Sequence, residues 1–281
     1  MERAYTLGLY EKAMPSDLTW REKLLAAKEA GFDFVEISID ETDAKLSRLD
    51  MTKEERLGLV RLMQETGVPI RTMCLSGLRK YPLGSSDPAV EARGIEIMEK
   101  AIRLAEDLGI RIIQLAGYDV YYEESTFETK KRFLANLKKA ADMAAKAGVT
   151  MGFETMENEF MNTVEKAMKY VTLVGSPYLN VYPDIGNITN AAKTYENDVL
   201  EDLELGKGHI VAMHLKETVP GKFREIPFGT GHVDFESAVT KAWELGVRKY
   251  VTEFWYTGNP GWKEDLTFAN EMFTRILNGR Q

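Results

Sequence analysis

The chain has 281 residues, of which 44% are hydrophobic and 28% are charged, and its formal net charge is −8. This composition is typical of a soluble globular protein, and the negative charge argues against nucleic acid or an anionic membrane as the main partner. Cys74 is the single cysteine, so an intrachain disulfide is impossible and a cytoplasmic location is expected. The sequence predicts neither a signal peptide nor a membrane span, which would need ~20 apolar residues.

One pattern recurs along the chain: a segment with helical periodicity, then a glycine, then a short β-rich run. A first strand is predicted at residues 5–10 (YTLGLY). A further strand follows each of seven glycines, which stand roughly 27 to 42 residues apart: Gly31, Gly67, Gly109, Gly148, Gly175, Gly208 and Gly246. Glycine suits the position after a helix because it adopts the left-handed conformation without a Cβ clash.

The intervening segments read as helices. Apolar residues in 89–107 and in 127–146 fall on one helical face, and Asp87 and Pro88 suit the N-cap and first position of the earlier helix. Eight strand–helix units predict an α/β fold, a single (β/α)8 TIM barrel that occupies residues 1–281 as one domain. A doubly wound open sheet is disfavoured because no G-x-G-x-x-G motif follows the first strand.

Four successive predicted strands end on a potential metal ligand. The runs VTMGFE, LNVYPD, IVAMH and KYVTE end at Glu154, Asp184, His214 and Glu253. Each residue alone would equally fit a helix cap, an ion pair or a hydrogen bond. Together, at the carboxyl ends of barrel strands where active sites lie, they predict one divalent cation site. Three carboxylates and one imidazole suit Mn²⁺ or Mg²⁺, with Co²⁺ and Zn²⁺ as alternatives.

Polar residues in the predicted loops are candidates for substrate contacts. Arg224, in the loop after the seventh strand, is expected over the cation site, and Asp234 is expected to cap the next helix. Ser76 and Arg79 follow the third strand and form either a phosphate site or an exposed basic turn. Glu157 and Glu159 are expected in a solvated loop.

These strand ends and loops resemble the L-ribulose-5-phosphate 3-epimerases, also called L-xylulose-5-phosphate 3-epimerases. The most specific pieces are DFVEISIDETDAKLSRLD, IQLAGYDVYYE, VYPDIGN, HLKET with PGKFREIPFGTG, and TEFW. The resemblance covers essentially the whole chain. It implies one divalent metal held by Glu154, Asp184, His214 and Glu253, with the two glutamates as the acid–base pair. It also implies substrate near Arg224, a homodimer, and a place in ascorbate or pentose catabolism.

Three positions depart from related sequences. Leu78 stands where such epimerases often carry a histidine, and Asn187 stands where free-ketose epimerases often have one, so Asn187 is a candidate substrate contact. Lys216 replaces a small residue of the free-ketose enzymes. It lies two residues beyond His214, hence on the same face of the strand, where it could meet an anionic group.

These observations predict metal-dependent 3-epimerisation of a ketopentose 5-phosphate, L-xylulose 5-phosphate to L-ribulose 5-phosphate, through a cis-enediolate. Alternatives on the same site are a 3-epimerase of free ketoses, such as D-tagatose, D-fructose or D-allulose, and a ketose–aldose isomerase. A metal-dependent nuclease on a related fold is disfavoured by the acidic pI and by only three histidines. A sugar-binding barrel without catalysis remains the alternative from another class.

Overall fold

The computed structural model describes residues 3–280, in which eight strands form one parallel sheet in the order β6-β5-β4-β3-β2-β1-β8-β7. The strands are β1 (Thr6–Tyr10), β2 (Phe34–Ser38), β3 (Ile70–Leu75), β4 (Ile112–Ala116), β5 (Thr150–Glu154), β6 (Leu179–Tyr182), β7 (Met213–Leu215) and β8 (Lys249–Thr252). Two isolated parallel bridges, Val181 with Ile210 and Asp184 with His214, join β6 to the β7 segment. The sheet thereby becomes a nearly closed barrel, as the sequence predicts.

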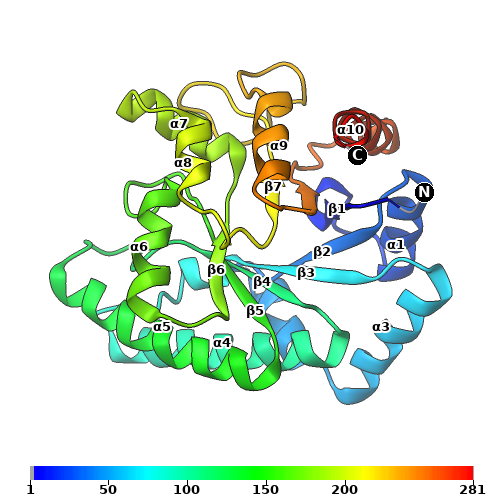
Figure 1. Cartoon of the computed structure of the whole chain (residues 1–281). Coiled ribbons are helices and arrows are strands. Elements are labelled where there is room, and N and C mark those ends of the chain that lie inside the picture. Colours follow the sequence, from blue (N-terminus) through cyan, green and yellow to red (C-terminus); the bar gives the residue numbers. More distant parts are fainter. Residues whose placement is uncertain (1–2, 281) are drawn as a thin grey trace.

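Helices surround the strands on the outside of the barrel (Figure 1). They are α1 (Trp20–Glu29), α2 (Asp43–Leu46), α3 (Lys53–Thr66), α4 (Pro88–Leu108), α5 (Phe127–Ala147), α6 (Val164–Val174), α7 (Ile185–Tyr195), α8 (Val199–Glu204), α9 (Phe235–Glu244) and α10 (Trp262–Asn278). Three short 3₁₀ turns accompany them: η1 (Glu11–Ala13), η2 (Ser47–Asp50) and η3 (Ser76–Arg79). None of the helices in residues 3–280 has the length and apolarity that a membrane crossing requires.

The predicted helix boundaries are confirmed at their caps. Asp87 accepts the backbone N–H of Ala89 at the start of α4, with Pro88 in the first turn, and Asp234 caps α9. All seven glycines singled out in the sequence have positive φ; Gly109 and Gly148, for example, end α4 and α5 at φ 72° and 66°. The repeat therefore reflects a real left-handed turn between each helix and the strand that follows.

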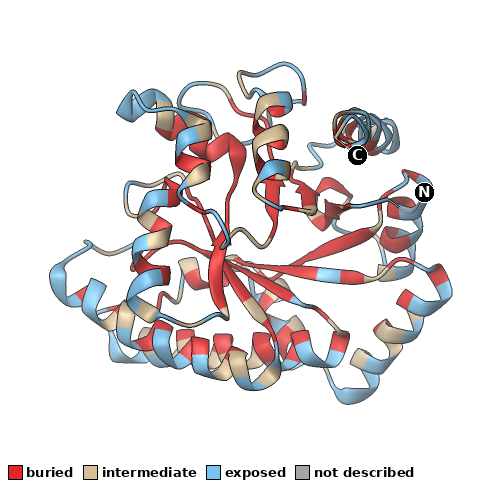
Figure 2. Ribbon diagram, viewed as in Figure 1, coloured by how far each residue is buried: buried red, intermediate tan, exposed pale blue. Residues whose placement is uncertain are grey.

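Apolar side chains pack in two layers, one between strands and helices and one inside the barrel. Figure 2 shows the strands almost wholly buried, while the outer faces of the helices are exposed. The smaller layer includes Tyr10, Phe34, Cys74 and Tyr182. Gly8 makes room for Phe34, because a Cβ at Gly8 would lie 2.3 Å from that ring. The aromatic ring fills the barrel here, and polar side chains continue toward the carboxyl ends of the strands.

Candidate metal centre

The structure brings the four predicted ligands together. One potential ligand atom from each of Glu154, Asp184, His214 and Glu253 lies within 4.8 Å of the others, and all four residues are buried. Glu154 ends β5, His214 is the middle residue of β7, and Glu253 directly follows β8. The predicted end of the sixth strand is wrong by two residues. β6 stops at Tyr182 because Pro183 has no N–H for the ladder, and Asp184 instead caps α7.

Unsatisfied atoms in this cluster point toward one another. Nδ1 of His214 lies 2.9 Å from Glu253 Oε2 and 3.7 Å from Glu154 Oε1. That Nδ1, Oε2 of Glu253 and Oδ2 of Asp184 are buried without a well-formed hydrogen bond, although Oδ2 of Asp184 forms an ion pair with Lys216. Buried polar atoms are normally satisfied, so three converging atoms without a hydrogen bond fit a cation held between them. The set is rich in oxygen, which suits a hard divalent ion.

Lys216 reaches the same cluster. Its ammonium Nζ lies 2.5 Å from Asp184 Oδ2 and 3.7 Å from Glu253 Oε2, and its side chain is only 5% exposed. The prediction that Lys216 shares a face with His214 is confirmed. In this geometry its charge neutralises part of the carboxylate cluster, and the residue lines the adjacent cavity.

Burial and mutual charge move the pKa values of the cluster in different directions. Burial and the nearby Glu253 carboxylate raise the pKa of Glu154, and burial raises the pKa of Asp184 despite Lys216. For Glu253, burial acts to raise the pKa, but Lys216 and His214 outweigh it, so that pKa is lowered. The pKa of His214 is raised because Glu36 and Glu253 outweigh its burial.

A cavity of about 180 Å³ opens beside the cluster at the carboxyl ends of the strands. Its lining includes four predicted substrate contacts, Ser76, Arg79, Lys216 and Arg224, together with Glu154 and Glu253. Asn187 is not among the lining residues: its side-chain amide donates to the backbone carbonyl of Thr155 at 2.7 Å. Leu78 is also absent from the lining and is buried in η3.

Two arginines meet one carboxylate at the mouth of the cavity. Oε1 of Glu157 lies 3.2 Å from Arg224 and 3.9 Å from Arg79. The prediction of a solvated Glu157 is therefore wrong: its side chain is 20% exposed and lines the cavity. Arg79 also donates to the hydroxyl of Tyr118 at 3.2 Å. The sequence could not reveal this arrangement because the partners come from three separate loops.

The loop that carries Arg224 is organised by a buried carboxylate. Glu217 accepts backbone N–H groups of Thr218, Gly229 and Val233 at 3.0 to 3.2 Å. A Cβ at Gly231 would lie 2.2 Å from Glu217 Oε1, so the loop closes tightly around this side chain. The Glu217 carboxylate thus accepts backbone N–H groups that would otherwise lack a partner, because the loop is neither helix nor sheet.

Glu36 is a residue of the site that the sequence analysis did not identify. It lies at the centre of β2, fully buried, with Oε1 2.6 Å from Nε2 of His214. Gln114, on β4, similarly contacts Glu154. A signal was present in the sequence: a glutamate within the apolar strand FVEIS is rarely buried without a partner.

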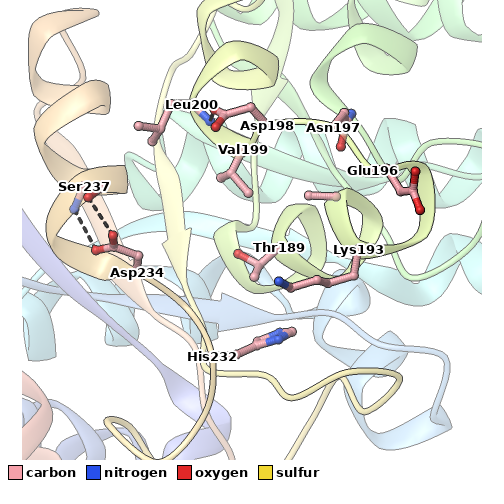
Figure 3. A pocket seen from close by; sticks show the side chains of 11 residues that line it. Thr189, Lys193, Glu196, Asn197, Asp198, Val199, Leu200, His232, Asp234 and Ser237 are labelled. Atoms are coloured by element: carbon pink, nitrogen blue, oxygen red, sulfur yellow. Dashed lines mark hydrogen bonds between the residues drawn. The ribbon is translucent and has the colours of Figure 1, made fainter.

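A larger hollow of about 480 Å³ lies elsewhere, lined by α7, the start of α8 and the start of α9 (Figure 3). It shares no lining residue with the cavity beside the cluster. Two of its three acidic groups serve their own helices: Asp198 caps α8, and Asp234 pairs with Ser237 in α9. The convergent chemistry therefore belongs to the smaller cavity.

Comparison with known proteins gives a consistent family. Residues 24–272 match the family described as xylose isomerase-like TIM barrel. The chain is 50% identical over 256 residues to the L-ribulose-5-phosphate 3-epimerase UlaE of Salmonella paratyphi C (strain RKS4594), covering 91% of this chain and 89% of the relative. Its counterpart in Escherichia coli (strain SMS-3-5 / SECEC) is 49% identical over the same shares.

Solved structures share the architecture at low sequence identity. A D-psicose 3-epimerase in the presence of D-fructose superposes with a TM-score of 0.81 at 15% identity, covering 98% of this chain and 99% of the other. An L-ribulose 3-epimerase gives 0.77 at 20% identity, covering 98% and 95%. At these identities the likeness establishes the fold.

Proposed function

The chain belongs to the xylose isomerase-like TIM-barrel family and, within it, to the L-ribulose-5-phosphate 3-epimerases, and on this premise we propose that it epimerises a ketopentose 5-phosphate at C3. The substrate pair is L-xylulose 5-phosphate and L-ribulose 5-phosphate, and the enzyme is an isomerase. The observation that carries the proposal is the convergence of Glu154, Asp184, His214 and Glu253 on one buried point beside a cavity.

These four residues would hold one divalent cation, Mn²⁺ in the first instance, with Mg²⁺, Co²⁺ and Zn²⁺ as alternatives. The chemistry supplied by a bound divalent ion is polarisation of the C2 carbonyl and compensation of the negative charge on the enediolate. The protein contributes a dry setting for that charge, since Glu154 and Glu253 are each 6% exposed through their side chains.

The two glutamates act as the acid–base pair. One carboxylate removes the proton from C3. The electron pair of the broken C–H bond forms the C2–C3 double bond, and the π pair of the C2 carbonyl moves onto its oxygen to give the enediolate. The other glutamate, as the carboxylic acid, donates a proton to the opposite face of C3, which inverts its configuration. Glu154 ends β5 and Glu253 follows β8, so the two carboxylates come from separate strands of the barrel, as such opposed transfer requires.

The phosphate is assigned to the cationic mouth of the cavity. Arg79 and Arg224 both lie within 4 Å of one oxygen of Glu157, so a single small anion could reach both guanidinium groups. Ser76 offers a hydroxyl in the same lining. Lys216 then serves the sugar end of the substrate, because its ammonium lies on Asp184 and close to Glu253.

Proton NMR in D₂O tests the proposal. The enzyme is loaded with Mn²⁺, freed of excess ion with chelating resin, and offered L-xylulose 5-phosphate, D-fructose and D-tagatose separately. Exchange at C3 with epimer formation on the phosphate alone supports the proposal. Exchange on the free sugars alone keeps the mechanism and overturns the phosphate assignment. Exchange on none of them overturns 3-epimerisation.

We also propose that the protein is a homodimer located in the cytoplasm. Sedimentation tests the oligomeric state, and cell fractionation tests the location.

A further inference from the structure

Glu36 has both carboxylate oxygens engaged around one imidazole. Its Oε1 lies 2.6 Å from His214 Nε2, and its Oε2 accepts the hydroxyl of Tyr182 at 2.9 Å. All three side chains are fully buried. The glutamate comes from β2 and the histidine from β7, so the contact spans the interior of the barrel.

The imidazole is confined by its neighbours as well as by this contact. The Tyr182 ring meets the His214 ring edge-on, with 4.8 Å between centroids, and the Tyr10 ring lies at 6.3 Å. Rotation of the imidazole would break the contact between Nε2 and Glu36. The ring orientation is therefore fixed by one polar contact and by packing.

The contact with Glu36 also decides which nitrogen of His214 is free to bind a cation. An imidazole that binds a cation through one ring nitrogen carries its single proton on the other, and Nε2 has a carboxylate oxygen at 2.6 Å to receive that proton in a hydrogen bond. Nδ1 is then the nitrogen with a lone pair available. It is also the nitrogen that faces Glu253 and Glu154.

We propose that Glu36 is a positioning residue of the cation site, acting through His214. By accepting the Nε2 proton it holds the tautomer whose Nδ1 faces the carboxylates, and its charge makes that nitrogen a stronger ligand. The inference rests on the proposed function, since it requires a divalent cation at this site. Loss of such a partner typically weakens metal affinity 10–100-fold.

The test compares the dissociation constant for Mn²⁺ in chelator-stripped wild type, Glu36→Gln and Tyr182→Phe, measured from the free Mn²⁺ signal by electron paramagnetic resonance. Glu36→Gln keeps the shape and removes the charge, so its Kd is expected to rise about 10–100-fold. Tyr182→Phe retains the Glu36–His214 contact and is the matched control, with a smaller rise expected. Thermal melting of each variant checks that it is folded.

A second readout is made on the wild-type chain, with one variant used only to assign the signals. In Zn²⁺-loaded wild type labelled with ¹⁵N-histidine, the ring signals of three histidines are to be resolved, and His214→Asn assigns one of them. The expected result is a proton on Nε2 and zinc on Nδ1. A proton on Nδ1 overturns the inference.

The outcomes separate this inference from the proposed function. Folded Glu36→Gln with the wild-type Kd overturns the inference, whatever the epimerase assay gives. If Glu36→Gln binds Mn²⁺ more weakly but the wild type epimerises none of the ketoses, the inference is supported and the proposed function is overturned. A wild type that binds no divalent cation overturns both.

Discussion

Glu11 is the centre of a buried ionic cluster whose removal should measurably destabilise the barrel. Its carboxylate, fully buried in η1, lies 2.6 Å from Lys45, 2.5 Å from Arg48 and 3.4 Å from Lys23. It also accepts the backbone N–H of Ser38 at the end of β2. The cluster joins the loops after β1 and β2, and Glu11→Gln would leave three cations around a neutral amide.

The magnitude follows from the pKa of the carboxyl. Burial acts to raise the pKa of Glu11, but Arg48, Lys45 and Lys23 outweigh it and lower the pKa from 4.5 to about 2. At 1.36 kcal/mol per pH unit, the ionised carboxylate contributes about 3 kcal/mol. The pKa of Lys45 is lowered by burial and by Arg48 despite Glu11, so the cation does not share this gain. Removing the Glu11 carboxylate would lower the pKa of Lys45 further and destabilise its charged form.

The assay is urea unfolding of wild type and Glu11→Gln between pH 7 and pH 3. A folded-state pKa below the unfolded one stabilises the protein above pH 4.5, and that contribution is lost as pH falls toward 2. The difference should be about 3 kcal/mol at pH 7, or roughly 6–12 °C in Tm, and about half as large at pH 3. Glu65→Gln, from an exposed pair with Arg21, should cost under about 0.5 kcal/mol.

Two results would refute this reasoning. One is a Glu11→Gln variant as stable as the Glu65→Gln control at pH 7. The other is a difference between wild type and Glu11→Gln that stays constant down to pH 3, which would mean that the loss comes from packing and not from charge.

Three further outcomes follow from the site. Glu253→Gln should reduce epimerisation below about 1% of wild type while leaving measurable Mn²⁺ binding, and turnover above that level would contradict its assignment as acid or base. Arg224→Gln should raise KM for the ketose 5-phosphate about tenfold in steady-state kinetics; an unchanged KM would remove it from the phosphate site. Glu217→Ala leaves three backbone N–H groups without their acceptor, so it should cost about 2–3 kcal/mol in urea unfolding and speed proteolysis within residues 218–233. If Glu217→Ala resists proteolysis as well as the wild type does, the loop conformation does not depend on Glu217.

The sequence predicts those features that follow from local chemistry. The glycine after each helix, such as Gly109, reports a backbone requirement, and the barrel places every strand end on one face. Glu154 and Glu253 could therefore be identified without coordinates. Glu157 could not, because its position depends on Arg79 and Arg224, which come from loops far apart in the sequence. Glu36 was not identified from the sequence because it lies inside a strand, away from the strand ends where catalytic residues are expected.

Two isolated bridges connect β6 to the β7 segment. The other neighbouring strands in residues 3–280 are joined by longer ladders of paired residues. One of these bridges joins Asp184 to His214, so two of the four residues proposed to hold the cation stand on opposite sides of this short junction. An ion that binds the folded state favours it by RT ln(1 + [ion]/Kd), about 2.7 kcal/mol at a hundredfold excess over Kd. Under the proposed function, the bound cation would therefore stabilise closure of the barrel as well as supply chemistry to the reaction. The concentration of that ion would then set the stability of the fold as well as the rate of the reaction.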